Sequence, residues 1–225
     1  TSHKYVSHRC AEIMGKPIDK LKLITCHLGN GSSITAVQDG HVLDTTMGLT
    51  PLDGFMMGTR SGTLDPSVVT FIMERENLTP KEMDNILNKK SGLLGVSGVS
   101  SDARDVAQAV VEGNPRAVLA QEMLVYQIVK YIGAFAAAMN GVDAIVFTAG
   151  LGENHVIVRQ RVCESLKYLG VTPDINLNEK MTRGNEGKIT TENSTVDVYV
   201  IPTNEELVIA RDTRSILEAM QYANL

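Results

Sequence analysis

The sequence predicts an α/β protein in which a three-stranded antiparallel meander is joined to two parallel strands by crossover helices. Three short apolar runs, 21–26, 33–38 and 41–45, follow one another with only a few residues between them. This spacing is typical of antiparallel strands connected by tight turns. Two further apolar runs, 144–148 and 196–201, are separated by enough chain for a helix, as parallel strands require. The predicted order is βββ, a helical insertion, then αβαβα.

Composition narrows the classes of partner. The 225 residues are 43% hydrophobic and 21% charged, with a formal net charge of −5, which is ordinary for a globular protein. An acidic balance excludes nucleic acid as the main partner, since binding phosphate backbones needs a basic face. Cys10, Cys26 and Cys163 lack metal-ligand spacing, as expected of apolar packing residues in a reducing cytosol. No apolar run is long enough to cross a bilayer, so we expect a cytoplasmic protein without a membrane partner.

The most informative segment is 24–33, ITCHLGNGSS, which reads as a strand entering a glycine turn before the next strand. Glycines on both sides of Asn30 allow a sharp turn and a close approach of the backbone to a ligand. Amides of such a turn can bind an anion, and His27, Ser32 and Ser33 add polar groups. The simpler interpretation is an ordinary hairpin, because Asn-Gly is the commonest two-residue hairpin turn. Both interpretations can hold at once.

The remaining elements follow from apolar periodicity and from glycine and proline positions. Predicted helices cover 2–14, 66–76, 80–90, 116–140, 149–169 and 204–220. Predicted loops cover 47–66 and the glycine-rich segment 92–100, and 180–194 is expected to be a surface hairpin or loop. Thr203 is expected to cap the last helix, with Glu206 completing a capping box. This order matches a half-domain of the actin-like ATPase and sugar-kinase group, which has a ribonuclease H-like fold and binds nucleotide between two such halves.

Six short motifs resemble those of one family, the acetate kinases, within the short-chain acyl-phosphate kinases. They occur in the order of that family and are TSHKY at 1–5, TCHLGNGSS at 25–33, MMGTRSG at 56–62, SDARD at 101–105, GLGEN at 150–154 and NEEL at 204–207. Thr63 and His155 depart slightly from the family pattern, and neither is a predicted site residue. The resemblance implies that 1–225 is a C-terminal domain. We expect an N-terminal half-domain, which supplies the catalytic Asp, to precede it.

The resemblance also implies the site residues. Nucleotide and phosphate binding is assigned to His27, Leu28, Gly29, Asn30, Gly31, Asp102, Ala103, Arg104, Gly150, Leu151, Gly152, Glu153 and Asn154. The other roles are transition-state stabilisation by Arg60 with His27, an acyl-methyl pocket at Pro51, and Mg²⁺ binding at Glu205. Each has a simpler interpretation from sequence alone. Arg60 resembles a solvated loop arginine and His27 a core histidine, while Glu205 is a carboxylate favoured at a helix start.

The function implied is ATP-dependent phosphorylation of acetate to acetyl phosphate, and the reverse, by direct in-line transfer. ATP or ADP and acetate or acetyl phosphate are then the partners, and Mg²⁺ is the cofactor. A kinase for propionate or another short-chain carboxylate is an alternative, because the acyl pocket is shared with the expected half-domain. A catalytically inactive nucleotide-binding or dimerising fragment is another. The nearly all-apolar segment 117–139 and the resemblance together predict a homodimer.

Overall fold

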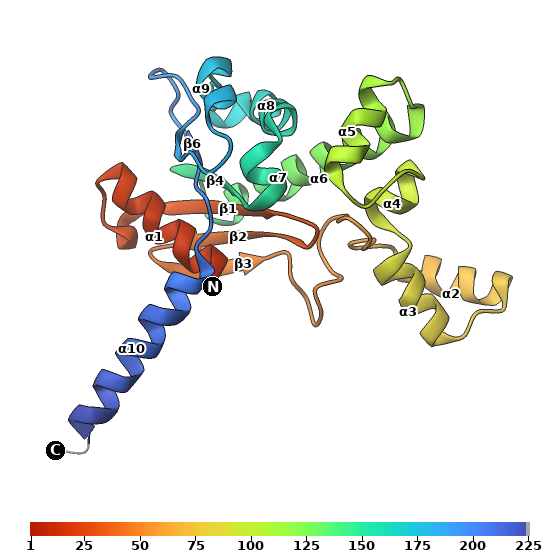
Figure 1. The fold of residues 1–225 in the computed structure, drawn as a ribbon, viewed down its shortest axis with the longest axis horizontal. Coiled ribbons are helices and arrows are strands. Elements are labelled where there is room, and N and C mark those ends of the chain that lie inside the picture. The colour runs from red at the N-terminus through yellow and green to blue at the C-terminus, as the bar shows by residue number, and fades with distance from the viewer. Residues whose placement is uncertain (224–225) are drawn as a thin grey trace.

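A computed structural model describes residues 1–223 and places a six-stranded mixed sheet at the centre of the molecule (Figure 1). The strands are β1 (Lys22–Leu28), β2 (Ser32–Gln38), β3 (His41–Thr45), β4 (Ala144–Thr148), β5 (Gly187–Lys188) and β6 (Asp197–Val200). Their order across the sheet is β3-β2-β1-β4-β6-β5. β1, β2 and β3 form the antiparallel meander, and β4 and β6 continue it in parallel from β1. This confirms the predicted α/β topology.

Helices cover both faces of the sheet (Figure 1). They are α1 (Ser2–Met14), α2 (Pro66–Glu76), α3 (Pro80–Lys89), α4 (Gly92–Ser97), α5 (Ala103–Val111), α6 (Pro115–Ala138), α7 (Ala149–Asn154), α8 (Val156–Ser165), α9 (Ile175–Lys180) and α10 (Glu205–Ala223). None of these described helices is long and apolar enough to span a membrane. α2 and α3 form an arm beside the main body, and α10 projects from the main body on another side.

Alternation along β1 determines which face each side chain meets. Leu23 packs with Val6 and Cys10 of α1 on one face. Ile24 and Cys26 pack in the larger cluster that contains most of α6 on the opposite face. Thr25 and His27 share the parity of Leu23, so their side chains lie on the α1 face.

The predicted glycine-rich loop 92–100 is wrong for its first half, because Gly92–Ser97 is helix α4. Its first turn is fixed by tertiary hydrogen bonds that no local pattern shows. The Leu93 and Leu94 amides donate to the carbonyls of Met57 and Gly58 at 2.8 and 3.0 Å. These bonds satisfy amides that a helix start leaves free and tie α4 to the preceding loop.

The predicted helix 149–169 is also divided. It breaks at His155, whose backbone (φ −93°, ψ 80°) is not helical and whose ring accepts the Val158 amide at 3.4 Å. The polar segment 180–194 contains the end of α9 and the short strand β5, and so agrees only partly with a loop.

The last helix begins with a different cap from the one predicted. Asn204, and not Thr203, accepts the Leu207 amide through its side chain at 3.1 Å. Glu206 is therefore the second helical residue and cannot complete a capping box, which needs the third. Thr203 instead donates its hydroxyl proton to Ser2 at 2.9 Å.

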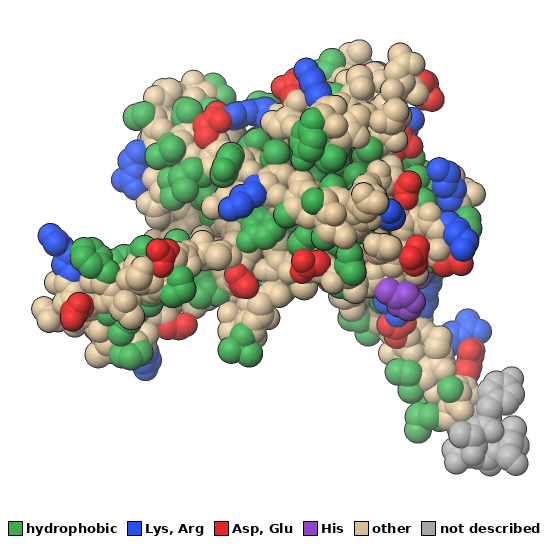
Figure 2. All heavy atoms as spheres, turned by 180° about the vertical axis from the view of Figure 1, so that it is seen from behind, with side chains coloured by type: hydrophobic (Ala, Val, Ile, Leu, Met, Phe, Trp, Pro, Cys, Tyr) green, Lys and Arg blue, Asp and Glu red, His purple; other side chains and the backbone are tan. Residues whose placement is uncertain are grey.

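The apolar helix α6 buries nine of its 24 residues within this chain. Its buried residues are Ala117, Ala120, Gln121, Leu124, Val125, Ile128, Ile132, Phe135 and Ala136. α4, α5 and α8 pack along it. Leu119 and Tyr126 stay exposed, at 52% and 69%. Figure 2 shows other apolar side chains on the α2–α3 arm and on α10, where Phe71, Ile209 and Ile216 are exposed.

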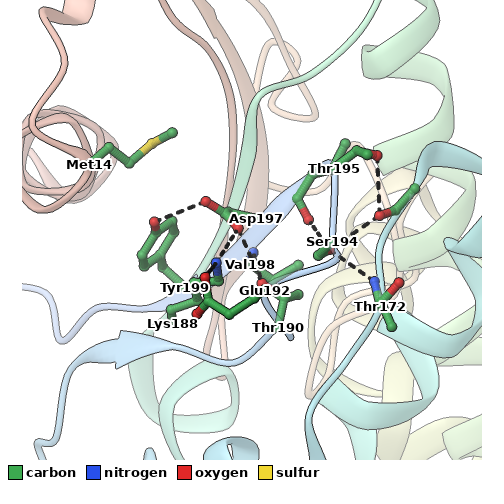
Figure 3. Close-up of polar contacts among 12 residues, drawn as sticks. Met14, Thr172, Lys188, Thr190, Glu192, Ser194, Thr195, Asp197, Val198 and Tyr199 are labelled. Atoms are coloured by element: carbon green, nitrogen blue, oxygen red, sulfur yellow. Dashed lines mark hydrogen bonds and ion pairs between the residues drawn. The ribbon is translucent and has the colours of Figure 1, made fainter.

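The far edge of the sheet is held by polar contacts around Asp197 (Figure 3). Its carboxylate accepts from Lys188 at 3.0 Å, from Thr190 at 3.4 Å and from the Tyr199 hydroxyl at 3.2 Å. Nearby, Ser194 accepts the Thr172 amide at 3.0 Å. These bonds anchor the segment between β5 and β6, so the short edge strand has side-chain as well as ladder support.

Arg159 is a fully buried cation that joins three elements. Its guanidinium donates to the Asn178 side chain at 2.8 Å and to the carbonyls of Gly152, Asn178 and Met181 at 2.8 to 3.0 Å. Burial lowers the pKa of this guanidinium to about 10, so it stays charged at neutral pH. Four charge-assisted bonds to neutral oxygens hold α7, α8 and α9 together.

We expect Arg159→Met to lower the free energy of unfolding by about 2–4 kcal/mol, because it leaves buried carbonyls without donors. Urea denaturation of the chain measures this. Arg161→Met is the matched control on the same helix, since Arg161 makes only a partly exposed ion pair with Glu122. Its loss should cost less than about 1 kcal/mol. Equal stabilities of the two variants would show that the buried network contributes little.

Candidate active site

The predicted site residues gather where β1 and β4 end side by side. The parallel register pairs His27 with Thr148, so the glycine turn after β1 lies next to the start of α7. A Cβ placed on Gly29 would be 3.8 Å from the Cβ of Ala149. The Thr148 hydroxyl is buried and has no hydrogen-bond partner among the described residues. A buried hydroxyl in that state marks a place that a ligand or water can satisfy.

The turn spans Gly29, Asn30 and Gly31, one residue longer than the simple hairpin interpretation. Ser32 closes it by accepting the Gly29 amide at 3.2 Å and donating to the Gly29 carbonyl at 2.9 Å. Gly29 and Gly31 both have negative φ. Glycine at these positions instead lets other groups come close to the backbone, because a Cβ on Gly31 would lie 3.2 Å from Nη1 of Arg60.

Arg60 therefore lies directly against the glycine turn. Its Nη1 also lies 3.5 Å from the Pro51 carbonyl oxygen. The backbone of its loop is attached to the turn, since Gly58 donates its amide to Asn30 at 3.2 Å. The structure thus brings the predicted transition-state stabiliser, acyl-pocket residue and phosphate turn together.

Gly92 is a site-supporting residue that the sequence analysis missed. It has φ +63°, and a Cβ there would lie 2.2 Å from the Met57 carbonyl oxygen and 3.0 Å from the Arg60 amide nitrogen. Only glycine permits this contact between α4 and the Arg60 loop. The feature of the sequence that could have pointed to Gly92 is its position directly before a short apolar run.

His27 lies on the α1 face, with its Nδ1 2.8 Å from the Ser2 hydroxyl. Burial lowers its pKa, and the nearby carboxylates Glu205 and Glu153 partly oppose that shift. His27 is therefore neutral at physiological pH. Because its side chain is half-buried at the end of a strand, one ring edge stays available at the turn.

The neighbouring His3 has a different environment. Both of its ring nitrogens are engaged, at 2.7 Å from Thr25 and 2.7 Å from Ser33. Burial lowers its pKa to about 4. A neutral ring bonded at both nitrogens has a structural role.

Glu205 lies at the start of α10, close to the beginning of α1. Its Oε1 accepts the Thr1 hydroxyl at 2.7 Å, and this bond is the main reason that its pKa is lowered. No group of three potential ligands able to hold a metal occurs among the described residues. A single ionised carboxylate still fits Mg²⁺, which keeps several waters and is completed by substrate phosphates.

The GLGEN segment forms helix α7 and is partly occupied by its own contacts. Ala149, which precedes it, has φ +65°, an uncommon value without glycine. Glu153 folds back to accept the amides of Ala149 at 2.8 Å and of Thr203 at 3.3 Å. The Asn154 side chain donates to Gly150 and accepts the Arg183 amide, both at 3.0 Å. Glu153 and Asn154 thus hold the turn in shape.

Asp102 caps α5, and its carboxylate binds the exposed Arg104 side chain, which holds the pKa of Asp102 near 2. Ala103 lies apart from this pair. It lines a small, largely apolar hollow that α7 also lines through Leu151. The remaining walls of the hollow are Leu93, Val106, Gln121, Leu124, His155 and Val158. Leu28, in contrast, is a buried core residue that can offer a ligand only its backbone.

Chemically, the arrangement presents a guanidinium, a neutral imidazole and a glycine turn around one point, with an apolar hollow farther along. The first three groups suit a small anion, whereas the hollow has a volume of about 10 Å³ and cannot enclose a flat ring. A wider hollow of about 430 Å³ lies elsewhere, between α1 and α10, and is lined by exposed charged side chains. It holds none of the predicted site residues.

Comparison with known proteins places the chain in one family. Residues 1–211 match the model of the Acetokinase family. The acetate kinase of Halothermothrix orenii is 56% identical over 219 residues, which are 97% of this chain and 54% of that protein. The chain thus spans about half the length of the curated relatives it matches.

Two solved structures are similar. The acetate kinase of Porphyromonas gingivalis superposes with a TM-score of 0.93 at 51% identity, covering 96% of this chain and 54% of that one. A propionate kinase from Francisella tularensis gives 0.86 at 44% identity, covering 93% and 52%. The half-domain fold predicted from the sequence, that of the actin-like ATPases, is confirmed by this likeness. With most of its length matched by the family model and by relatives far above chance identity, the chain belongs to the acetokinase family.

Proposed function

We propose that the chain is the C-terminal half of an enzyme that transfers a phosphoryl group between ATP and acetate. The observation that carries the proposal is the position of Arg60, with Nη1 3.2 Å from the site of a Cβ on Gly31. A cation held this close to a glycine turn places positive charge beside backbone amides, a combination that suits a small anion. Acetate is proposed as the phosphoryl acceptor because the chain belongs to the acetokinase family.

In-line transfer spreads negative charge over the three equatorial oxygens of the phosphoryl group. The planar guanidinium of Arg60 can bind two of these oxygens at once. His27 and the amides of the turn can donate to the remaining oxygens. Because these donors are already positioned by the protein, they stabilise the transition state without being reorganised during the reaction.

Nucleotide is proposed to bind along the edge of the sheet. Gly150–Asn154 and Asp102–Arg104 flank the apolar hollow, and the base would lie over Ala103 and Leu151 at its mouth, since its volume of about 10 Å³ is too small to enclose a ring. Glu205 would hold Mg²⁺ together with the substrate phosphates. The ion would supply positive charge to neutralise those phosphates.

A preference for propionate or another short-chain acid is the alternative acceptor specificity. It is favoured by the propionate kinase among the similar structures, and Pro51 would line the pocket in both cases. Turnover of acetate, propionate and butyrate by the full-length enzyme separates these acceptors. The highest kcat/KM for propionate would replace the acetate assignment.

We expect the 225-residue chain alone to bind ATP but to show no acetyl phosphate formation, since half the length of its relatives is lacking. Calorimetric titration with ATP and a coupled assay with acetate measure the two properties. Robust turnover by a contamination-free preparation would contradict the half-domain proposal. Absence of ATP binding would contradict the proposed nucleotide site.

In the full-length enzyme, we expect Arg60→Ala to lower kcat about 10²–10⁴-fold, as for loss of a preorganised donor. The KM for ATP should change little, because the hollow and its flanking turns are untouched. Arg60→Lys should recover only part of the loss, since an ammonium cannot bind two oxygens in a fixed plane.

Arg75→Ala is the matched control, because Arg75 is exposed on α2 and lies 3.9 Å from Glu76. It should leave kcat unchanged. Added guanidinium should partly restore the activity of Arg60→Ala and not affect the control. Activity of Arg60→Ala within threefold of the parent would remove Arg60 from the site.

We also propose a homodimer of the full-length enzyme, in which the exposed part of α6 is covered. The support is the pair Leu119 and Tyr126, two large apolar side chains two turns apart on one helix. Light scattering at micromolar concentration should give a dimer mass, and Leu119→Glu with Tyr126→Glu should give a monomer. A monomeric parent protein would refute the proposal. A double variant that remains dimeric would place the interface elsewhere.

A further inference from the structure

We propose that Ser2 and Thr203 form a hydrogen-bond relay that holds His27 in one tautomer, with its proton on Nε2 and directed toward the glycine turn. Ser2 is then a positioning residue for the donor at the phosphoryl site. The consequence for catalysis rests on the proposed function, whereas the tautomer is a property of this chain alone.

The direction of the relay follows from counting protons. Thr203 donates its hydroxyl proton to Ser2 Oγ at 2.9 Å, and Ser2 Oγ lies 2.8 Å from Nδ1 of His27. Ser2 Oγ accepts from Thr203 and still has its own proton to donate, and among the described residues Nδ1 of His27 is the one acceptor bonded to it, so Ser2 directs that proton to Nδ1. A neutral imidazole has one N–H. Since Nδ1 accepts, the proton is on Nε2.

The position of Nε2 makes this tautomer relevant to a ligand. A Cβ on Gly29 would lie 3.8 Å from Nε2, so this atom faces the turn that also contacts Arg60. Among the described residues, nothing is hydrogen-bonded to Nε2. The opposite tautomer would present a lone pair there and repel a phosphoryl oxygen.

The relay is held by rigid parts of the fold. Ser2 is 6% exposed in the first turn of α1. Thr203 lies in the connection from β6 to α10, and its amide is fixed by Glu153 of α7 at 3.3 Å. His27 ends β1. The relay therefore joins α1, the central strand and the connection to α10 at the edge of the site.

Three consecutive side chains at the start of the sequence all make hydrogen bonds to residues distant in sequence. Thr1 binds Glu205, Ser2 binds His27, and His3 binds Thr25 and Ser33. His3 is 6.2 Å from His27 between ring centroids, but both of its nitrogens are engaged. Of these two histidines, His27 is the one with a ring nitrogen, Nε2, that has no hydrogen bond among the described residues.

The first test is spectroscopic and does not depend on activity. In the 225-residue chain with ¹⁵N-labelled histidine, two-bond ¹H–¹⁵N spectra at a pH of about 8 report the tautomer of the neutral His27 ring, whose pKa is lowered by burial. Comparison with His27→Gln assigns the signals. We expect a pyrrole-type Nε2 and a pyridine-type Nδ1 for His27. A pyrrole-type Nδ1 would overturn the proposal.

The second test removes the relay. Ser2→Ala should give His27 signals of mixed tautomers. It should also lower kcat of the full-length enzyme about 10–100-fold, the usual loss when the hydrogen-bond partner that orients a functional histidine is removed. Thr203→Val should have a smaller effect in the same direction, and Ser2→Thr should restore both signals and kcat. The KM for ATP should remain within about twofold.

Ser7→Ala is the matched control. Ser7 is 3% exposed on the same helix and donates its hydroxyl proton to the Lys4 carbonyl, away from His27. It should change neither the His27 signals nor kcat. Equal losses of kcat in Ser2→Ala and Ser7→Ala would show a general packing effect and overturn the positioning role. If His27 has the expected tautomer but the full-length enzyme phosphorylates no carboxylate, the proposed function is refuted and the relay is not.

Discussion

The parallel pairing of β1 with β4 is the contact on which the arrangement of the site depends. It aligns the carboxyl ends of two strands that are more than a hundred residues apart in sequence. The turn after β1 and the helix after β4 then share one edge, which is where ligands bind in open α/β sheets. Arg60 reaches the same edge because its loop is attached to the turn through Gly58 and to α4 through Gly92.

The other face of β1 shows how the site is supported. A central strand covered on both sides is normally apolar throughout, yet Thr25 and His27 lie beneath α1. Buried polar groups are costly unless they are bonded. Here the first residues of α1 provide the partners, so the helix that covers the sheet also orients its histidine. Stability of this layer and geometry of the site therefore depend on the same hydrogen bonds.

Much of the fold could be predicted from local signals. Alternation and turn residues identified β1, β2 and β3, and prolines at helix starts located α2 and α3. The errors have different causes. Helix α4 needs the carbonyls of Met57 and Gly58, which are distant in sequence, whereas the break at His155 is local, because its ring caps α8 through the Val158 amide. The cap of α10 moved to Asn204 because Thr203 is bound to Ser2 from the other end of the chain.

The site shows the same division. Motif resemblance predicts the site residues, but not which of them have free groups. Glu153, Asn154, Asp102 and Arg104 are largely engaged with their own segments, whereas Arg60 and His27 retain atoms that face the turn. Sequence spacing alone does not distinguish these two conditions, because one of the two bonds that occupy Glu153 comes from Thr203, fifty residues away.

The helices α2 and α10 have few buried residues within the described part of this chain. None of the residues of α2 is buried, and α10 carries exposed Ile209, Ile216 and Leu217 as it projects from the body. An isolated helix gains little stability in water from propensity alone and usually depends on burying an apolar face. These helices therefore lack, within this chain, the burial that normally stabilises a helix, whereas the central strands β1 and β4 are largely buried. Such a contrast fits a chain that spans about half the length of its relatives: the edge of β1 and β4 presents donors for an anion, and the helices around it present apolar surface that further protein can cover.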